Sequence, residues 1–113
     1  MHGLKFMGIF GPSNPLYDNG TVARSDEGIA AYAAMVAAYA RRYQEQAVAG
    51  EFLIELVNEP NGGGGYSNAT LYAELVATTA VAVRAAMPSK DAAAAVQIVG
   101  CVTNVIEGLI LQC

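Results

Sequence analysis

A largely apolar run that ends in an amide, a carboxylate and a proline constrains this chain more than any other stretch. Residues 52–57 have the length and the branched side chains of a buried β-strand. Pro60 has no backbone N–H, so strand pairing is expected to stop there. Asn58 and Glu59 are therefore predicted at the C-terminal end of a strand at residues 52–58, which is where α/β folds place their ligands.

Glu59 is a candidate general acid or base, and a solvated strand-end carboxylate is the simpler alternative. Side chains of a strand alternate between its faces, so Asn58 and Glu59 reach one site only if a bulge or a strong twist occurs at residues 57–59. The same alternation places Glu55 on the face of Glu59. Glu55 is thus predicted to be a buried carboxylate that needs a partner, and no Arg or Lys of the chain is an obvious one.

Strand-like and helix-like segments alternate along the chain. Strands are predicted at residues 4–10, 52–58 and 96–102, and amphipathic helices at residues 26–43 and 69–87, with Ser25 and Asn68 as their N-caps. Segments 44–51 and 90–95 are predicted to be connectors, and residues 106–113 the opening of a third helix. Successive βαβ units build a parallel sheet, so the predicted fold class is α/β with three parallel strands.

The carboxyl ends of parallel strands point the same way, so the loops that follow them should share one face with Glu59. These loops are residues 11–24, 60–68 and 103–105. Tyr17 and Tyr66 lie in the first two of these loops, where loop packing is the simplest role for each. Asn14 and Asn104 are the amide candidates in the first and third loops.

The composition is unusually apolar for a short chain. Hydrophobic residues make up 54% of the 113 residues and charged residues only 14%. A small domain exposes a large share of its surface, and an open three-stranded sheet leaves two unpaired edges and an uncovered apolar face. Residues 1–113 are therefore expected to form a single incomplete domain, whose partners include missing strands of a larger structure.

Charge and motif content argue against several classes of function. The net charge is −4 and the six Lys and Arg residues form no stripe, which argues against a nucleic-acid partner. His2 has no cysteine or second histidine near it, so no metal site is predicted. The glycine run 62–65 lacks the features of a phosphate loop, and no cofactor is predicted. The apolar segment 92–111 is a poor membrane span, and residues 1–11 make no convincing signal peptide.

Residues 54–61 (IELVNEPN) resemble the fourth-strand motif of clan A glycoside hydrolases, the retaining (β/α)8-barrel enzymes similar to glycoside hydrolase families 5 and 39. The flanks agree. Residues 14–20 (NPLYDNG) and 25–28 (SDEG) are similar to the loop and helix start after the third strand, and residues 95–100 (AVQIVG) to the fifth strand. The resemblance spans nearly the whole chain but only about three of the fold's eight strands. It implies a fragment of a TIM barrel.

By this resemblance Glu59 matches the general acid/base, and Asn58 matches the amide that binds the sugar 2-hydroxyl. The implied substrate is a polysaccharide or oligosaccharide. A retaining hydrolase also needs a nucleophilic carboxylate about 5 Å from the acid, and the family's nucleophile lies on the seventh strand, beyond Cys113. The 113 residues alone are therefore not expected to hydrolyse a glycoside. The resemblance slightly favours secretion, and the sequence itself leaves the compartment open.

The chain also departs from the family pattern. The usual motif carries tryptophans where this chain has Ile54 and Val57, and the chain contains no tryptophan. Sugar stacking would then depend on Tyr17, Tyr66 or missing strands. Two alternatives stay open for this reason: a non-catalytic carbohydrate-binding or structural barrel remnant, and a truncated gene product without activity.

Overall fold

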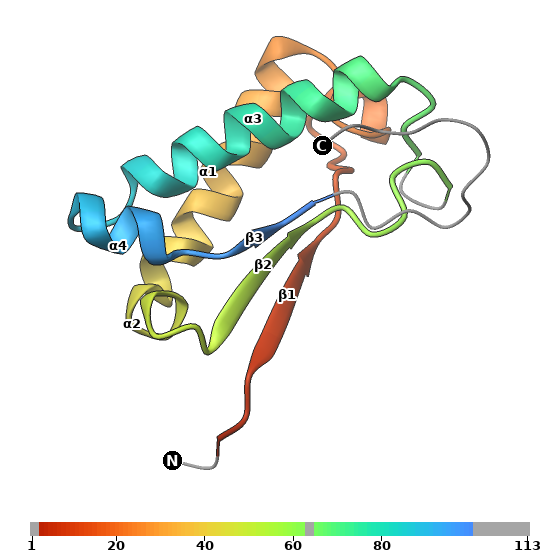
Figure 1. Cartoon of the computed structure of the whole chain (residues 1–113). Helices are drawn as coiled ribbons and strands as arrows, with labels where there is room; N and C mark the ends of the chain where they lie inside the picture. The colour runs from red at the N-terminus through yellow and green to blue at the C-terminus, as the bar shows by residue number, and fades with distance from the viewer. Residues whose placement is uncertain (1–2, 63–64, 101–113) are drawn as a thin grey trace.

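Three parallel strands form one sheet in the order β1-β2-β3 (Figure 1). The computed structural model describes residues 3–62 and 65–100. Its elements are β1 (Phe6–Phe10), the 3-10 turn η1 (Asp18–Gly20), α1 (Asp26–Arg42), α2 (Gln44–Val48), β2 (Phe52–Leu56), α3 (Ala69–Ala85), α4 (Lys90–Ala95) and β3 (Ile98–Val99). The predicted α/β class with a parallel sheet is confirmed.

The strand register brings the ends of β1 and β2 to the same level. Phe6 lies opposite Phe52, and Phe10 lies opposite Leu56. On the other side of β2, Ile54 lies opposite Ile98 of β3. The strands are shorter than predicted: β1 starts two residues later, and β2 ends two residues earlier, before Asn58. The part of the third strand predicted beyond residue 100, and the helix opening at 106–113, lie outside the described residues.

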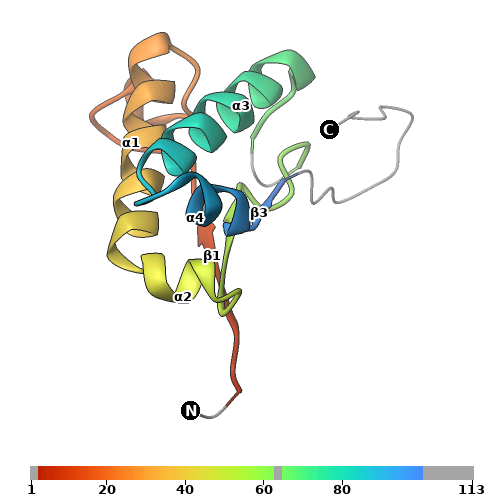
Figure 2. The ribbon, with the colours of Figure 1, turned by 60° about the vertical axis from the view of Figure 1, so that its left-hand side comes forward.

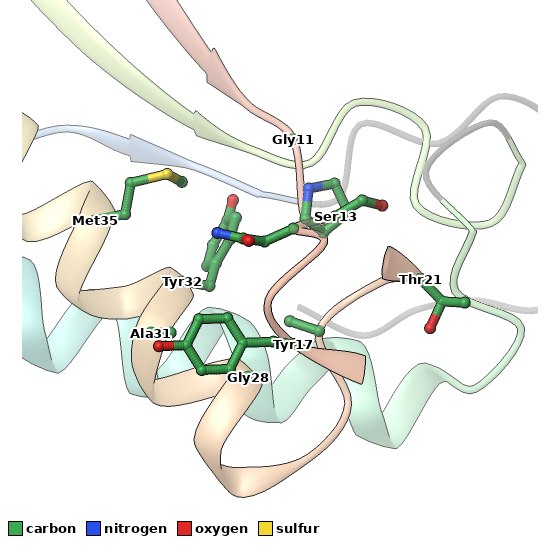
Figure 3. A pocket seen from close by; sticks show the side chains of 11 residues that line it. Gly11, Ser13, Tyr17, Thr21, Gly28, Ala31, Tyr32 and Met35 are labelled. Carbon is green, nitrogen blue, oxygen red and sulfur yellow. The ribbon is translucent and has the colours of Figure 1, made fainter. Parts of the chain in front are cut away.

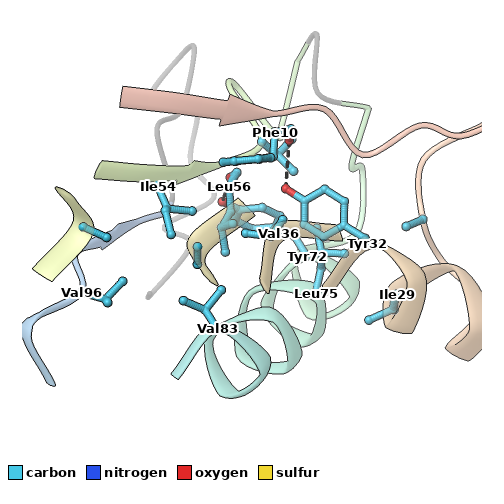
Figure 4. Packing of buried hydrophobic residues seen from close by; sticks show 14 of the residues in the cluster. Phe10, Ile29, Tyr32, Val36, Ile54, Leu56, Tyr72, Leu75, Val83 and Val96 are labelled. Atoms are coloured by element: carbon cyan, nitrogen blue, oxygen red, sulfur yellow. Dashed lines mark hydrogen bonds between the residues drawn. The ribbon is translucent and has the colours of Figure 1, made fainter. Parts of the chain in front are cut away.

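All described helices lie on one face of the sheet (Figures 1 and 2). The core lies between this helical layer and the strands, and Figure 4 shows Ile54 and Leu56 pointing into it toward α1 and α3. Side chains alternate along each strand, so Met7 and Ile9 point to the opposite face. They are 47% and 55% exposed, so this face of the sheet is uncovered at the edge strand β1.

The two long helices begin at the predicted caps. The Ser25 side chain accepts a hydrogen bond from the backbone N–H of Gly28, at 3.0 Å. The Asn68 side chain accepts from the N–H groups of Thr70 and Leu71 at 2.9 and 3.3 Å. These oxygens satisfy N–H groups that have no partner within a helix, which fixes where each helix starts. In residues 3–62 and 65–100 no helix is long and apolar enough to cross a membrane.

Two segments predicted to be connectors are helical instead. Residues 44–48 form α2. Gly50 follows this helix with a φ of 72°, a left-handed conformation that is common just after a helix end. Residues 90–95 form α4, where the Ser89 side chain accepts a hydrogen bond from the Ala92 N–H and four alanines follow. Alanine has the highest helix propensity, and a capped run of it forms a short helix without an amphipathic stripe.

Candidate active site

The backbone leaves extended geometry directly after β2. Val57 has a φ of 61° and Glu59 a φ of 47°, both in the left-handed region. A β-branched residue is an outlier there, and such a conformation costs about 1–3 kcal/mol. A departure from regular strand geometry at residues 57–59, the condition for Asn58 and Glu59 to reach one site, is present and takes the form of two left-handed residues.

Asn58 and Glu59 lie side by side at this turn. Asn58 is exposed and Glu59 is half-buried, and the residues that flank this pair in the chain, Val57 and Pro60, are buried. The Glu59 carbonyl accepts a hydrogen bond from Gly62 N–H at 2.9 Å, which closes the turn. The candidate acid therefore sits on a hydrogen-bonded backbone at the C-terminal end of the central strand.

The neighbouring loop, residues 11–24, is closed by its own hydrogen bonds. Ala23 N–H donates to the Pro12 carbonyl at 2.9 Å. The Asp18 carboxylate accepts from the N–H groups of Arg24 and Ser25 at 3.0 and 3.1 Å. The N–H of Arg24 is the main cause that lowers the pKa of Asp18 below its usual value. Asp18 thus joins the loop to the start of α1.

Asn14 and Tyr17 lie together in this loop. They line a cavity of about 50 Å³, and Figure 3 shows Tyr17 beside Gly28 and Ala31 of α1. Pockets that enclose small molecules measure roughly 300–1,000 Å³, so this cavity is too small for a sugar. Its lining does not include Glu59. Asn14 and Tyr17 therefore line the same cavity, whereas Glu59 does not line it.

Tyr66 packs within the loops instead of facing a ligand site. Its side chain is 5% exposed, and its hydroxyl donates a hydrogen bond to the Ala23 carbonyl at 2.8 Å. Its ring centroid lies 5.6 Å from that of Tyr72. Burial is the main cause that raises the pKa of Tyr66 to about 12. Tyr66 therefore joins the loop after β2 to the loop after β1, and little of its side chain is exposed.

Glu55 is buried as predicted, with 2% exposure. Strand alternation places it on the face of the sheet opposite the helices, because its neighbours Ile54 and Leu56 enter the helical core. Its Oε1 atom has no hydrogen-bond partner among the described residues. The remaining candidate, Asn104, lies outside the described residues.

Two buried tyrosines at the strand ends were not expected from the sequence. The hydroxyl of Tyr32 on α1 donates to the Phe10 carbonyl at 2.9 Å, and that of Tyr72 on α3 donates to the Leu56 carbonyl at 3.0 Å (Figure 4). Tyr32 lies on the buried face of the amphipathic helix predicted at residues 26–43, but neither its contact with a strand end nor that of Tyr72 was predicted. These contacts could have been anticipated from one general rule: a tyrosine hydroxyl that is buried needs a hydrogen-bond acceptor.

Among the described residues, Glu59 is the carboxylate that directly follows the end of a strand. Among residues 3–62 and 65–100 no three His, Cys, Asp or Glu side chains group as metal ligands. Glu59 combines partial burial with a fixed backbone and an adjacent amide. Comparisons of the chain with family models, curated proteins and solved structures find no match.

Proposed function

We propose that this chain is the acid/base-bearing part of a retaining (β/α)8-barrel glycoside hydrolase that cleaves O-glycosidic bonds in a polysaccharide or oligosaccharide. One observation carries the proposal. Asn58 and Glu59 leave the C-terminal end of the central parallel strand together, through a turn that holds Val57 and Glu59 in the left-handed region. This end of the strands is where barrel enzymes assemble their catalytic residues.

Each side chain has a definite role in this chemistry. Glu59 protonates the glycosidic oxygen as the leaving group departs, and then removes a proton from the water that releases the sugar. The Asn58 amide hydrogen-bonds the 2-hydroxyl of the sugar, a contact that strengthens in the transition state. The half-buried position of Glu59 suits both steps, since it lets substrate reach the carboxylate while limiting its contact with water.

The open surfaces of the sheet support a larger barrel. Met7 and Ile9 of the edge strand β1 are exposed on the face without helices, and the same face carries the buried carboxylate of Glu55. Strands that are apolar on both faces are typical of parallel sheets covered on both sides. Further strands of the barrel would cover this face and supply the nucleophilic carboxylate.

A non-catalytic carbohydrate-binding or structural remnant is the second candidate. In the described part of the chain, β2 is the one strand whose C-terminal end carries a carboxylate. Retaining hydrolysis needs two carboxylates about 5 Å apart. This observation favours the second candidate unless a further strand brings the second carboxylate to Glu59.

The test uses the complete barrel protein, assayed on oligosaccharides with Glu59→Gln and with Glu74→Gln as the control. Glu74 is an exposed carboxylate on α3, so its loss should leave activity unchanged. Glu59→Gln should lower kcat/KM by about 10²–10⁴-fold, the usual contribution of a general acid. The first product released should keep the anomeric configuration of the substrate, as followed by NMR. Full activity of Glu59→Gln, an inverted product, or the lack of any longer barrel protein would overturn the proposal.

A further inference from the structure

The hydrogen-bond ladder between β1 and β2 stops one rung early. With Phe10 opposite Leu56 in a parallel pair, the next rung would join the Val57 N–H to the Phe10 carbonyl. The hydroxyl of Tyr32 takes this place instead. It donates to the Phe10 carbonyl at 2.9 Å, and while burial raises the pKa of Tyr32, the nearby Val57 N–H counteracts this rise.

The other side of the same peptide unit meets a second hydroxyl. Tyr72 donates to the Leu56 carbonyl at 3.0 Å, on the side of β2 that pairs with β3. A β carbon added to Gly100, which follows β3, would lie 3.6 Å from this hydroxyl. Tyr72 therefore lies where the ladder between β2 and β3 would continue.

The two hydroxyls thus hold one peptide unit, Leu56–Val57, from both of its polar ends. Tyr32 and Tyr72 are 5% and 1% exposed, so their hydroxyls, and not water, are the hydrogen-bond partners of these backbone groups. They come from two different helices, α1 and α3, on the covered face of the sheet. The residue that follows this peptide unit in the chain is the first left-handed one, Val57, with a φ of 61°.

We propose that Tyr32 and Tyr72 are positioning residues for the candidate site: their hydroxyls hold the Leu56–Val57 peptide out of the sheet ladder and so direct Asn58 and Glu59 together to the strand end. Without them the next rung closes directly and Val57 returns to extended geometry. Because strand side chains alternate, that change places Asn58 and Glu59 on opposite faces. The effect on catalysis rests on the proposed function, whereas the effect on the backbone does not.

The backbone effect is tested on the 113-residue chain by amide hydrogen exchange and NMR chemical shifts. The variants are Tyr32→Phe and Tyr72→Phe, which remove one hydroxyl each. Tyr66→Phe is the matched control, because it also removes a buried hydroxyl that donates to a backbone carbonyl, here that of Ala23. Tyr32→Phe should speed exchange of the Val57 amide about tenfold relative to the control. Both variants should shift the backbone signals of residues 57–59.

Signals of residues 57–59 that stay in place in both variants would overturn the proposal. A Val57→Gly background keeps the test decisive where a single variant does not fold, since glycine adopts a positive φ without strain. In the Val57→Gly background the left-handed turn forms without help from the tyrosine hydroxyls. The chemical-shift changes that Tyr72→Phe causes at residues 57–59 should therefore be smaller than in the unaltered chain. Shifts of equal size in both backgrounds would contradict the positioning role.

Activity of the complete barrel protein tests the catalytic consequence. Tyr72→Phe should lower kcat on natural glycosides, with a smaller loss on substrates with very good leaving groups, because these need no proton from Glu59 but still use the Asn58 contact. Tyr66→Phe should affect substrates with poor and with good leaving groups equally. If Glu59→Gln itself keeps full activity, the proposed function fails, and the exchange and shift measurements still decide the role of the two tyrosines.

Discussion

Phe10 and Leu56 lie opposite each other as the last residues of β1 and β2, and the carbonyl of each accepts a hydrogen bond from a buried tyrosine. The two loops that follow therefore start at the same level of the sheet. Tyr66 joins them further along, by donating to the Ala23 carbonyl. The hydroxyls of Tyr32 and Tyr72 thus contact the strand ends next to Asn58 and Glu59, whereas Tyr66 joins the two loops.

Two valines of α3 provide a matched test of the core. Val83 is fully buried against the sheet, and Val81 is 71% exposed on the same helix. Val83→Ala should lower the free energy of unfolding by about 1.5–3 kcal/mol, because it removes buried methyl groups and leaves a cavity. Val81→Ala should change it by about 0.5 kcal/mol or less. Equal losses in urea unfolding would show that α3 does not pack as described.

Gly28 lies in contact with Asp18 in a way that leaves no room for a side chain. A β carbon at this position would overlap the Asp18 carboxylate that accepts from Arg24 and Ser25. Gly28→Ala should therefore destabilise the protein by about 1–3 kcal/mol, although alanine favours helices. Gly11→Ala is the control, because a β carbon there meets open space at an ordinary φ. A stabilised Gly28→Ala variant in thermal unfolding would contradict the contact.

The fold followed from local sequence signals where those signals were strong. The apolar run before Asn58 predicted β2, and the caps Ser25 and Asn68 predicted where α1 and α3 begin. The short helices α2 and α4 were missed because each spans barely more than one turn and has no amphipathic stripe. Their formation depends on caps and on tertiary packing, which periodicity does not report.

Tyr66 should make stability fall at alkaline pH. Burial raises its pKa to about 12 from the ordinary value of 10.0. As the pH rises from about 10 to 12 the unfolded chain loses this proton first, so the free energy of unfolding decreases over that window and is flat below it. Tyr66→Phe should flatten the decrease, after a loss of about 0.5–1.5 kcal/mol at neutral pH from the missing hydrogen bond. Identical pH profiles of the two proteins in urea unfolding would rule out this contribution.

Glu55 should be replaceable by leucine with a gain in stability of the 113-residue chain. The carboxylate is 2% exposed and its Oε1 atom has no partner among the described residues. Glu55→Leu removes the cost of burying it and should raise the free energy of unfolding by about 1–3 kcal/mol. Glu74→Leu, on the exposed side of α3, should change it by about 0.5 kcal/mol or less. A clear loss of stability in Glu55→Leu would mean that the carboxylate has a partner.

The candidate site followed from the sequence in part. Residue order was enough to predict Asn58 and Glu59 at a strand end, and alternation showed that they could share a site only if a bulge or a strong twist occurred there. The groups that hold this turn come from Tyr32 and Tyr72, whose contacts join segments far apart in the chain, so no local pattern marks them. Tyr66 matched the loop position of a sugar-stacking residue, but its burial depends on tertiary packing.

The most direct test of the proposed role of Glu59 is the leaving-group dependence of Glu59→Gln in the proposed complete barrel protein. Aryl glycosides of increasing leaving-group basicity would be compared between this variant and the unaltered protein in single-turnover experiments. If Glu59 donates the proton, the loss in rate grows with leaving-group basicity and almost vanishes for the best leaving groups, which need no protonation. A loss of the same size for every leaving group would contradict the assignment of Glu59 as the general acid.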